Sequence, residues 1–277
     1  MTSPEVTSIT SRDNPLLKDL RRLAQDPGAY RKLGRVWLEG DHLCRAAREP
    51  GAPPSRRRGR RGGGRPAVAV FTESFWQAAQ FEWAGCAHKT VVLPDALLHG
   101  VSGLESPAPM GFVIDTPVQP ELMPMAPTVV LDRLQDAGNV GSILRSAAAF
   151  GFEQVVALKG TAALWAPKVL RAGMGAHFGL RLIEGVTVHA LDALQVPVLA
   201  TSSHGGQWLH EAQVERTLPH PCAWLLGHEG QGVSPELQQR ATRLIRIAQP
   251  GGEESLNVAA AAAICLHASA AISLWDQ

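Results

Sequence analysis

The sequence has little cysteine and no motif that would bind a metal. Its four cysteines, Cys44, Cys86, Cys222 and Cys265, lie far apart, without a CxxC pair or a histidine at ligand spacing. The ten histidines are equally scattered, and neither HxxxH nor HExxH occurs. Such cysteines are typical of small core side chains in a reducing compartment rather than of a disulfide framework or a zinc site. We therefore expect a cytoplasmic protein without a metal.

Targeting segments and nucleotide signatures are missing as well. The N-terminal residues show no apolar run followed by small residues, so no signal peptide is evident. The most apolar stretch, Val258 to Trp275, is rich in alanine and contains His267, which favours a buried or interfacial helix over a membrane span. Neither GxGxxG nor GxxxxGKS/T occurs, which argues against dinucleotide binding and against an ordinary nucleoside triphosphatase.

The charge of the chain is unevenly distributed. With 277 residues, 45% hydrophobic and 18% charged, the chain reads as a soluble globular protein with room for two domains. Residues 1–66 contain 15 Lys and Arg against 7 Asp and Glu, whereas the remainder contains 11 against 18. A basic N-terminal part suggests contact with a polyanion. A solvated face plus a disordered basic loop explains the same charge equally well.

Proline and glycine divide the chain into parts. The segment Glu49 to Pro66 is built from proline, glycine and six arginines, a composition that cannot form a core, so we expect a flexible insertion. The segment Thr116 to Pro127 has four prolines in twelve positions and marks the best domain boundary. We therefore predict one domain at 1–116, a proline-rich linker at 117–127 and a second domain at 128–277.

Apolar runs alternate with helical patterns in the second domain. The strand-like runs TVVLD, QVVAL, PVLATS, CAWLLG and LIRIA are separated by the helical SILRSAAAF and PKVLRAGMGAHF and followed by the alanine-rich helix. This alternation predicts an α/β domain with a mostly parallel sheet covered by helices. The first domain combines the amphipathic helix LLKDLRRLA with strands such as RVWLEG, AVAVF and TVVLP.

Three glycine-rich segments follow predicted strands of the second domain, where ligands usually bind in open α/β sheets. The first holds Asn139 and Arg145. The second holds Glu229, and the third holds Ser255 and Asn257. Each segment also has a plain structural interpretation: a β–loop–α connection, a carboxylate that ties the amides of its own loop together, and a serine N-cap for the closing helix.

These segments resemble a known family. NVGSILRSAAAFGF, LLGHEGQGVSPEL and IRIAQPGGEESLNVAAAAAI match, in order and spacing, the three signature motifs of the SpoU/TrmH family of RNA ribose 2′-O-methyltransferases. Upstream, RKLGRVWLEGDHLCRAA is similar to the family's N-terminal RNA-recognition domain, so the resemblance covers nearly the whole chain except the arginine-rich insertion. Relatives more often place serine at the position of Gly173, a difference that we interpret as neutral for activity.

The resemblance implies a fold and a cofactor. The fold is a mostly parallel α/β domain with a deep trefoil knot, preceded by a small α/β, L30e-like RNA-binding domain. S-adenosylmethionine sits bent in the knot, and relatives form homodimers through the helices of this domain. The positions that match the cofactor contacts of the family are Thr201, Gly227, Glu229, Gly230, Ile247, Pro250, Ser255 and Leu256.

The resemblance also implies the chemistry, in which a ribose 2′-hydroxyl attacks a sulfonium methyl group. Because a hydroxyl is a poor nucleophile near neutral pH, the site must orient it and offset the developing alkoxide charge. The matching catalytic positions are Arg145, Asn139, Glu229, Ser255 and Asn257. A guanidinium is a poor general base, so we expect Arg145 to hold a phosphate and stabilise the alkoxide. Asn139 and Asn257 then orient groups, and Glu229 shapes the cofactor loop.

For the first domain, the resemblance implies affinity for RNA. The candidate phosphate contacts are Lys18, Arg21, Arg22, Arg31, Lys32 and Arg35. An ordinary solvated helix face explains each of them almost as well. A separate recognition domain indicates a structured RNA, and the fit to two-domain relatives favours ribosomal over transfer RNA. The alternatives are a transfer RNA methyltransferase, a non-catalytic ribosome-assembly protein of the same fold, and, more remotely, a nicotinamide-dependent oxidoreductase.

Overall fold

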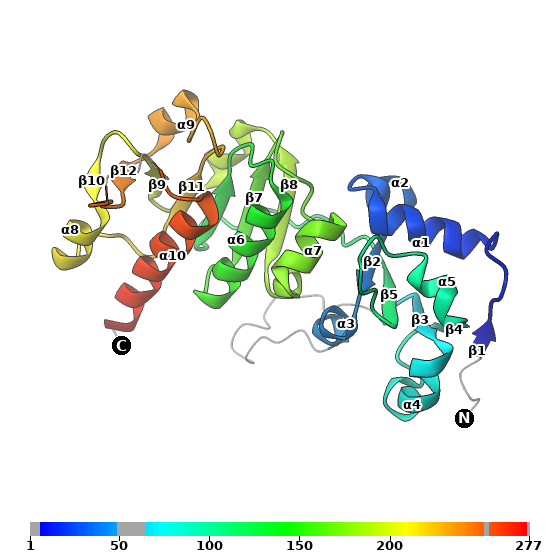
Figure 1. Cartoon of the computed structure of the whole chain (residues 1–277). Coiled ribbons are helices and arrows are strands. Elements are labelled where there is room, and N and C mark those ends of the chain that lie inside the picture. Colours follow the sequence, from blue (N-terminus) through cyan, green and yellow to red (C-terminus); the bar gives the residue numbers. More distant parts are fainter. Residues whose placement is uncertain (1–5, 49–64, 252–254, 276–277) are drawn as a thin grey trace. The chain divides into compact units, whose positions relative to one another are not determined.

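The computed structural model describes residues 6–48, 65–251 and 255–275. These residues form two compact units (Figure 1). The first unit comprises Met1–Val118 and Trp165–Phe178, and the second comprises Gln119–Leu164 and Gly179–Gln277. Most of the predicted arginine-rich insertion, residues 49–64, lies outside the described residues.

The first unit is built on a mixed sheet. Its strands are β1 (Val6–Ser8), β2 (Arg35–Glu39), β3 (Val68–Thr72), β4 (Lys89–Leu93) and β5 (Met110–Asp115). They lie in the order β1-β4-β3-β5-β2, with β5 antiparallel to both β2 and β3. Its helices include α1 (Pro15–Gln25), α2 (Ala29–Leu33), α3 (Asp41–Arg48), α4 (Glu73–Trp83) and α5 (Asp95–His99). The predicted helix LLKDLRRLA and the strands RVWLEG, AVAVF and TVVLP are confirmed.

Helix α1 shows how the sequence builds this unit. The side chain of Asn14 accepts a hydrogen bond from the Leu16 amide at 2.9 Å, and Pro15 occupies the first turn, where its missing N–H has no cost. The side chains that α1 buries recur at helical spacing and are Leu17, Leu20, Leu23 and Ala24. The basic side chains between them therefore lie on or near the outer face of the helix.

The segment Trp165–Phe178 belongs to the first unit although its sequence neighbours belong to the second. Its helix α7 (Pro167–Gly173) contacts α1 and β2. The helix is shorter than the predicted PKVLRAGMGAHF because Met174 and Gly175 adopt left-handed conformations, with φ of 47° and 83°. A Cβ at Gly175 would lie only 2.6 Å from the Cβ of Ala46 on α3, so this close approach requires glycine.

The second unit contains a seven-stranded sheet in which every pairing is parallel. Its strands are β6 (Thr128–Leu131), β7 (Gln154–Leu158), β8 (Arg181–Val186), β9 (Val198–Thr201), β10 (Gln207–Trp208), β11 (Ala223–Leu226) and β12 (Arg243–Arg246). Their order is β10-β12-β9-β11-β6-β7-β8. The predicted mostly parallel sheet is confirmed, whereas β8 and β10 are strands that the sequence pattern did not indicate.

The strand order of the second unit determines where its polar loops meet. Strands β12, β9, β11 and β6 are neighbours, and buried side chains such as Val130, Ala200 and Leu225 form the core beneath them. Because parallel strands end at the same edge of a sheet, the segments that follow these four strands gather at one edge. The loops that carry the predicted site residues are among these segments.

Four α-helices accompany the sheet of the second unit (Figure 1). They are α6 (Ala137–Ala149), α8 (Leu209–Val214), α9 (Pro235–Arg240) and α10 (Val258–Trp275). Helix α10 contacts α6, α8 and β11, and Ser269 on α10 accepts a hydrogen bond from the indole of Trp224 at 2.9 Å. In the part of the chain that the structure describes, no helix combines the length and apolar character needed to cross a bilayer.

Candidate active site

Three polar side chains from separate parts of the sequence form a hydrogen-bonded chain at the carboxyl edge of the second sheet. The Asn139 amide group donates to Glu229 Oε1 at 3.3 Å, and the Asn257 amide group donates to Asn139 Oδ1 at 3.0 Å. Asn139 lies in the first turn of α6, Glu229 lies after β11, and Asn257 precedes α10. The structure therefore brings together three of the five predicted catalytic residues.

Glu229 ties two loops together through its carboxylate. It accepts hydrogen bonds from the backbone amide of Asp136 at 3.2 Å and from that of Gln135 at 3.4 Å. Partial burial opposes ionisation, but hydrogen bonds from backbone amides, including its own, and from Asn139 outweigh it and lower the pKa of Glu229 below its ordinary value. Glu229 is therefore an anion near neutral pH and acts here as an acceptor that holds loops.

Asn257, and not Ser255, caps the N-terminus of α10. The Asn257 side-chain oxygen accepts hydrogen bonds from the amides of Ala259 at 2.9 Å and Ala260 at 3.3 Å. The predicted cap at Ser255 is wrong because the helix begins only at Val258, which places Asn257 at the position where a side chain reaches the free amides. The cap uses the oxygen of Asn257, and this leaves its nitrogen to donate to Asn139.

Arg145 stands apart from this network. It lies on α6 beyond Asn139, and its side chain is exposed. Among the described residues, no hydrogen bond or ion pair joins its guanidinium to the three hydrogen-bonded side chains. The predicted catalytic arginine is thus carried by the same helix as Asn139, with its charge free to meet a ligand.

The loop after β11 turns so tightly that its first residue has to be glycine. A Cβ on Gly227 would lie 2.0 Å from backbone atoms of both Gly232 and Val233. The loop is closed by a bridge between His228 and Gly232, and the Gly230 amide donates to the His228 ring at 3.1 Å. Because Gly227 allows the two ends of the loop to meet, Glu229 is presented from a compact turn.

Three of the predicted cofactor positions lie at the ends of adjacent strands. Thr201 ends β9, Gly227 follows β11 and Ile247 follows β12. The Thr201 hydroxyl donates to the Leu225 carbonyl at 3.1 Å. The other predicted positions, Glu229, Gly230, Pro250, Ser255 and Leu256, are exposed.

Gln249 places a buried polar atom near these positions. The side-chain oxygen of Gln249 is buried, and no hydrogen bond reaches it from the residues that the structure describes. Gln249 lies between Ile247 and Pro250, two of the predicted cofactor positions. An unpaired buried acceptor is costly, so a donor group of a bound ligand would fit here. The amino group of an adenine is such a donor.

Sequence reasoning missed several polar residues of the loop after β6. Asp136 caps α6 by accepting a hydrogen bond from the Asn139 amide at 2.8 Å, a role that its spacing three residues before Asn139 would have indicated. Asp132 is 3% exposed and accepts a hydrogen bond from the Ser234 amide at 2.8 Å. Arg133 pairs with Asp132. No sequence signal pointed to this buried carboxylate or to its partner.

The predicted RNA contacts all lie in the first unit. They are Lys18, Arg21 and Arg22 on α1, Arg31 and Lys32 on α2, and Arg35 at the start of β2. All are exposed except Arg21, which is half-buried. Two of them have contacts close in sequence: Lys18 lies 3.7 Å from Asp13, and the Arg31 guanidinium lies 5.0 Å from the ring centre of Tyr30.

The chain is similar to known RNA methyltransferases. A model of the SpoU rRNA Methylase family matches residues 126–267. An uncharacterized tRNA/rRNA methyltransferase of Synechocystis sp. is 31% identical, over 95% of this chain and 93% of that protein. The Bacillus subtilis 23S rRNA (guanosine(2553)-2'-O)-methyltransferase RlmP is 30% identical, over 64% of this chain and 70% of that protein. An AdoMet-bound rRNA methyltransferase from Sinorhizobium meliloti has a TM-score of 0.77 at 26% identity, covering 95% of this chain and 97% of that one.

Proposed function

This chain belongs to the SpoU rRNA methylase family and is an S-adenosylmethionine-dependent RNA methyltransferase, and on that premise we propose that it methylates a ribose 2′-hydroxyl of ribosomal RNA. The observation that carries the proposal is the chain of hydrogen bonds that joins Asn139, Glu229 and Asn257 at the carboxyl edge of the second sheet. The Bacillus subtilis relative, which acts on a guanosine 2′-oxygen of 23S rRNA, supports ribosomal over transfer RNA.

The ends of β9, β11 and β12 would hold the cofactor. S-adenosylmethionine supplies an electrophilic methyl group on a sulfonium sulfur. The backbone at Gly227 and Ile247 and the unpaired Gln249 oxygen would receive its adenine, and the exposed Ser255 and Leu256 would flank it. We further propose that the chain from β12 to α10 passes through a trefoil knot, which the non-sequential strand order supports.

The residues of this chain would prepare the hydroxyl for transfer. When bound, S-adenosylmethionine would supply its methyl group to this oxygen and leave as a neutral thioether, and the hydroxyl proton would go to solvent. Arg145 would hold the adjacent phosphate and stabilise the negative charge that develops on the oxygen. Asn139 and Asn257 would orient the reacting groups, because their own positions are fixed by Glu229 and by the cap of α10.

The first unit would recognise the RNA. We propose residues 1–116 as an L30e-like RNA-binding domain, 117–127 as a linker and 128–277 as the methyltransferase domain. The exposed basic side chains of α1, α2 and β2 support this assignment because phosphate contacts position an RNA without reading its sequence. The six arginines of the insertion would add affinity that does not depend on sequence.

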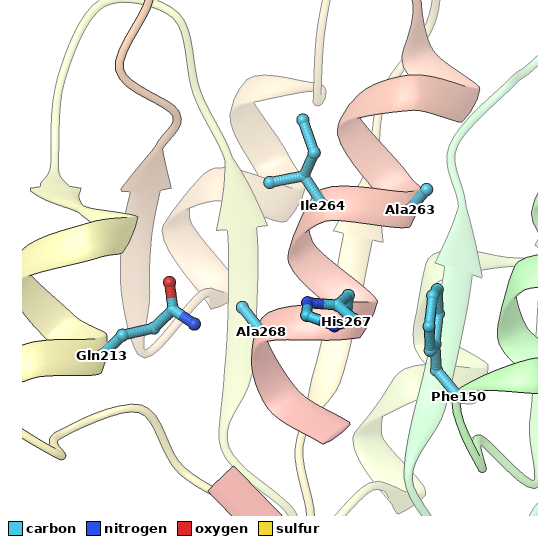
Figure 2. A pocket seen from close by; sticks show the side chains of 6 residues that line it. All are labelled: Phe150, Gln213, Ala263, Ile264, His267 and Ala268. Atoms are coloured by element: carbon cyan, nitrogen blue, oxygen red, sulfur yellow. The ribbon is translucent and has the colours of Figure 1, made fainter. Parts of the chain in front are cut away.

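A hollow on the helices of the second unit supports a homodimer. Its volume is about 370 Å³, and it is lined by Phe150, Gln213, Ala263, Ile264, His267 and Ala268 (Figure 2). Ile264 on α10 is 41% exposed, and the ring of Phe150 lies edge-on to His267 with centroids 5.4 Å apart. Small alanines allow close helix approach, so a second copy of this chain could pack α10 here in a symmetric pair.

Sedimentation tests the dimer. The native chain should sediment as a dimer at micromolar concentration, and Ile264→Glu should shift it toward the 29.6 kDa monomer because a charge would be buried in the interface. Val214→Glu, a change at an exposed position of α8 outside the lining residues, serves as the matched control. A native chain that sediments only as a monomer would reject the dimer.

A methyl-transfer assay tests the proposed reaction. The protein, incubated with radiolabelled S-adenosylmethionine and bulk RNA, should label ribosomal RNA at a 2′-oxygen that a deletion strain lacks. Label in transfer RNA would support the alternative substrate. Cofactor binding without any transfer to RNA would instead support a non-catalytic RNA-binding protein.

A further inference from the structure

Arg133 has a backbone conformation that its residue type disfavours. It is the second residue after β6 and has a φ of 59°, in the left-handed region where a Cβ is unfavourable. Such conformations persist where surrounding contacts hold them, and they occur often at functional sites. Only two other non-glycine residues of the described chain, Met174 and Arg216, share this sign of φ.

The contacts that hold Arg133 cross between two loops. Its guanidinium donates to both carboxylate oxygens of Asp132, at 2.9 and 3.3 Å, and to the side-chain oxygen of Gln231 at 3.1 Å. Asp132 is 3% exposed and also accepts from the Ser234 amide. The arginine thus supplies the countercharge of a buried carboxylate and reaches the loop after β11. Its side chain packs against Gly160, where a Cβ would lie 3.2 Å from the Arg133 Cγ.

With these bonds, the loop after β6 holds the loop after β11 at two separate places. At one end of the loop after β6, Asp132 and Arg133 hold Gln231 and Ser234. At the other end, the Gln135 and Asp136 amides hold Glu229. With only the Glu229 attachment, the loop could pivot about that residue. The second attachment, through both Asp132 and Arg133, restrains this movement.

We propose that Arg133 is a positioning residue that holds the loop His228–Ser234 in the conformation that receives S-adenosylmethionine. The proposal rests on the proposed function, since this loop carries the predicted cofactor positions Glu229 and Gly230. Arg133 touches neither cofactor nor RNA in this role. It acts through Asp132 and Gln231, and it keeps its strained backbone because its side chain must point back across both loops.

Cofactor affinity measured by calorimetry without RNA tests the proposal. Arg133→Gly relieves the left-handed strain but removes the guanidinium, so the Kd for S-adenosylmethionine should rise about tenfold, as loss of a charge-assisted hydrogen bond typically causes. Gln231→Ala removes only the bond across the loops from an exposed position and should raise the Kd about threefold. In turnover assays, KM for the cofactor should rise while kcat at saturation is retained.

Arg216→Gly provides the matched control. Arg216 also has a positive φ, 54°, at the exposed turn after α8, away from the cofactor positions, so its replacement relieves the same strain without touching the loop. The Kd of this variant should equal that of the native chain. Equal Kd values for the native chain, Arg133→Gly and Gln231→Ala would overturn the proposal, as would equal increases in Arg133→Gly and Arg216→Gly. A native chain that binds no cofactor would instead overturn the proposed function.

Discussion

The basic side chains predicted to contact RNA and the side chains of the candidate active site are held in different ways. In the first unit, two of the predicted RNA contacts have partners close in sequence: Lys18 lies near Asp13, and Arg21 donates to the Arg12 carbonyl. In the second unit, the site is joined by hydrogen bonds between residues 90 positions apart, Asn139 and Glu229, and 118 apart, Asn257 and Asn139. Local pairs persist whenever a helix forms, whereas the long-range bonds exist only when the whole sheet is assembled.

This difference fits the two tasks that we propose for the units. An RNA-binding face gains from exposed, mobile charges because phosphates can be met in many arrangements. A methyl-transfer site gains from fixed geometry because correct orientation of the reacting groups accounts for much of the rate acceleration. Arg145 is the exception in the second unit, since its side chain is exposed and lies outside the network.

Arg145→Ala should abolish most turnover while the Kd for S-adenosylmethionine stays near native. Removal of one well-placed stabiliser of developing charge costs on the order of 100- to 1000-fold in rate. Arg145→Lys keeps the charge but loses the planar fork, so single-turnover rates should recover only in part. If Arg145 were structural, both variants would lose cofactor binding and thermal stability as well. Near-native turnover by Arg145→Ala would refute its place in the catalytic centre.

Replacing five arginines of the insertion by serine should weaken RNA binding and flatten its dependence on salt. The positions are Arg56, Arg57, Arg58, Arg60 and Arg61. Each arginine that neutralises a phosphate contributes roughly 0.7 to 0.9 to the slope of log K against log salt concentration. Titrations at several salt concentrations measure the slope, with cofactor affinity as the unchanged control. An unaltered slope would show that these arginines do not meet the RNA.

Glu229→Gln should produce the smallest effect, visible in the pH dependence of stability. Because hydrogen bonding lowers the pKa of Glu229 in the folded chain, its contribution is present above the unfolded pKa and lost as pH falls through the folded pKa. At pH 7 the melting temperature of the variant should be about 2 °C lower than that of the native chain. The change is small because the carboxylate is largely exposed. The difference should vanish in acid. A pH-independent difference would mean that the charge of Glu229 contributes nothing.

The sequence predicted the loops of the site better than the bonds within them. Glycine-rich segments after apolar runs located the carboxyl edge, since β–loop–α patterns are local. The capping of α10 was misplaced by two residues because Ser255 and Asn257 are both good N-caps, and only the helix start separates them. The conformation of Arg133 could not be predicted from the sequence. It depends on contacts with a buried carboxylate and with Gln231, which lies 98 positions later in the chain.

Edge strands and long-range packing escaped prediction for similar reasons. The strand RLIEGV, β8, lies at the edge of its sheet, and its charged and glycine residues interrupt the apolar run that marks a buried strand. The two residues of β10, at the opposite edge, are too few for a pattern. The attachment of Trp165–Phe178 to the first unit depends on contacts far apart in sequence, such as that of Gly175 with Ala46.

The position of β9 has a consequence for synthesis on the ribosome. Its two neighbours, β11 and β12, both come later in the chain, and β11 fills the place between β9 and β6. A nascent chain that has emerged as far as residue 220 can assemble β6, β7 and β8, but β9 has no strand beside it. The sheet therefore closes only after β11 and β12 have emerged. Chains stalled in this interval would expose an unpaired strand edge, the kind of surface that chaperones shield.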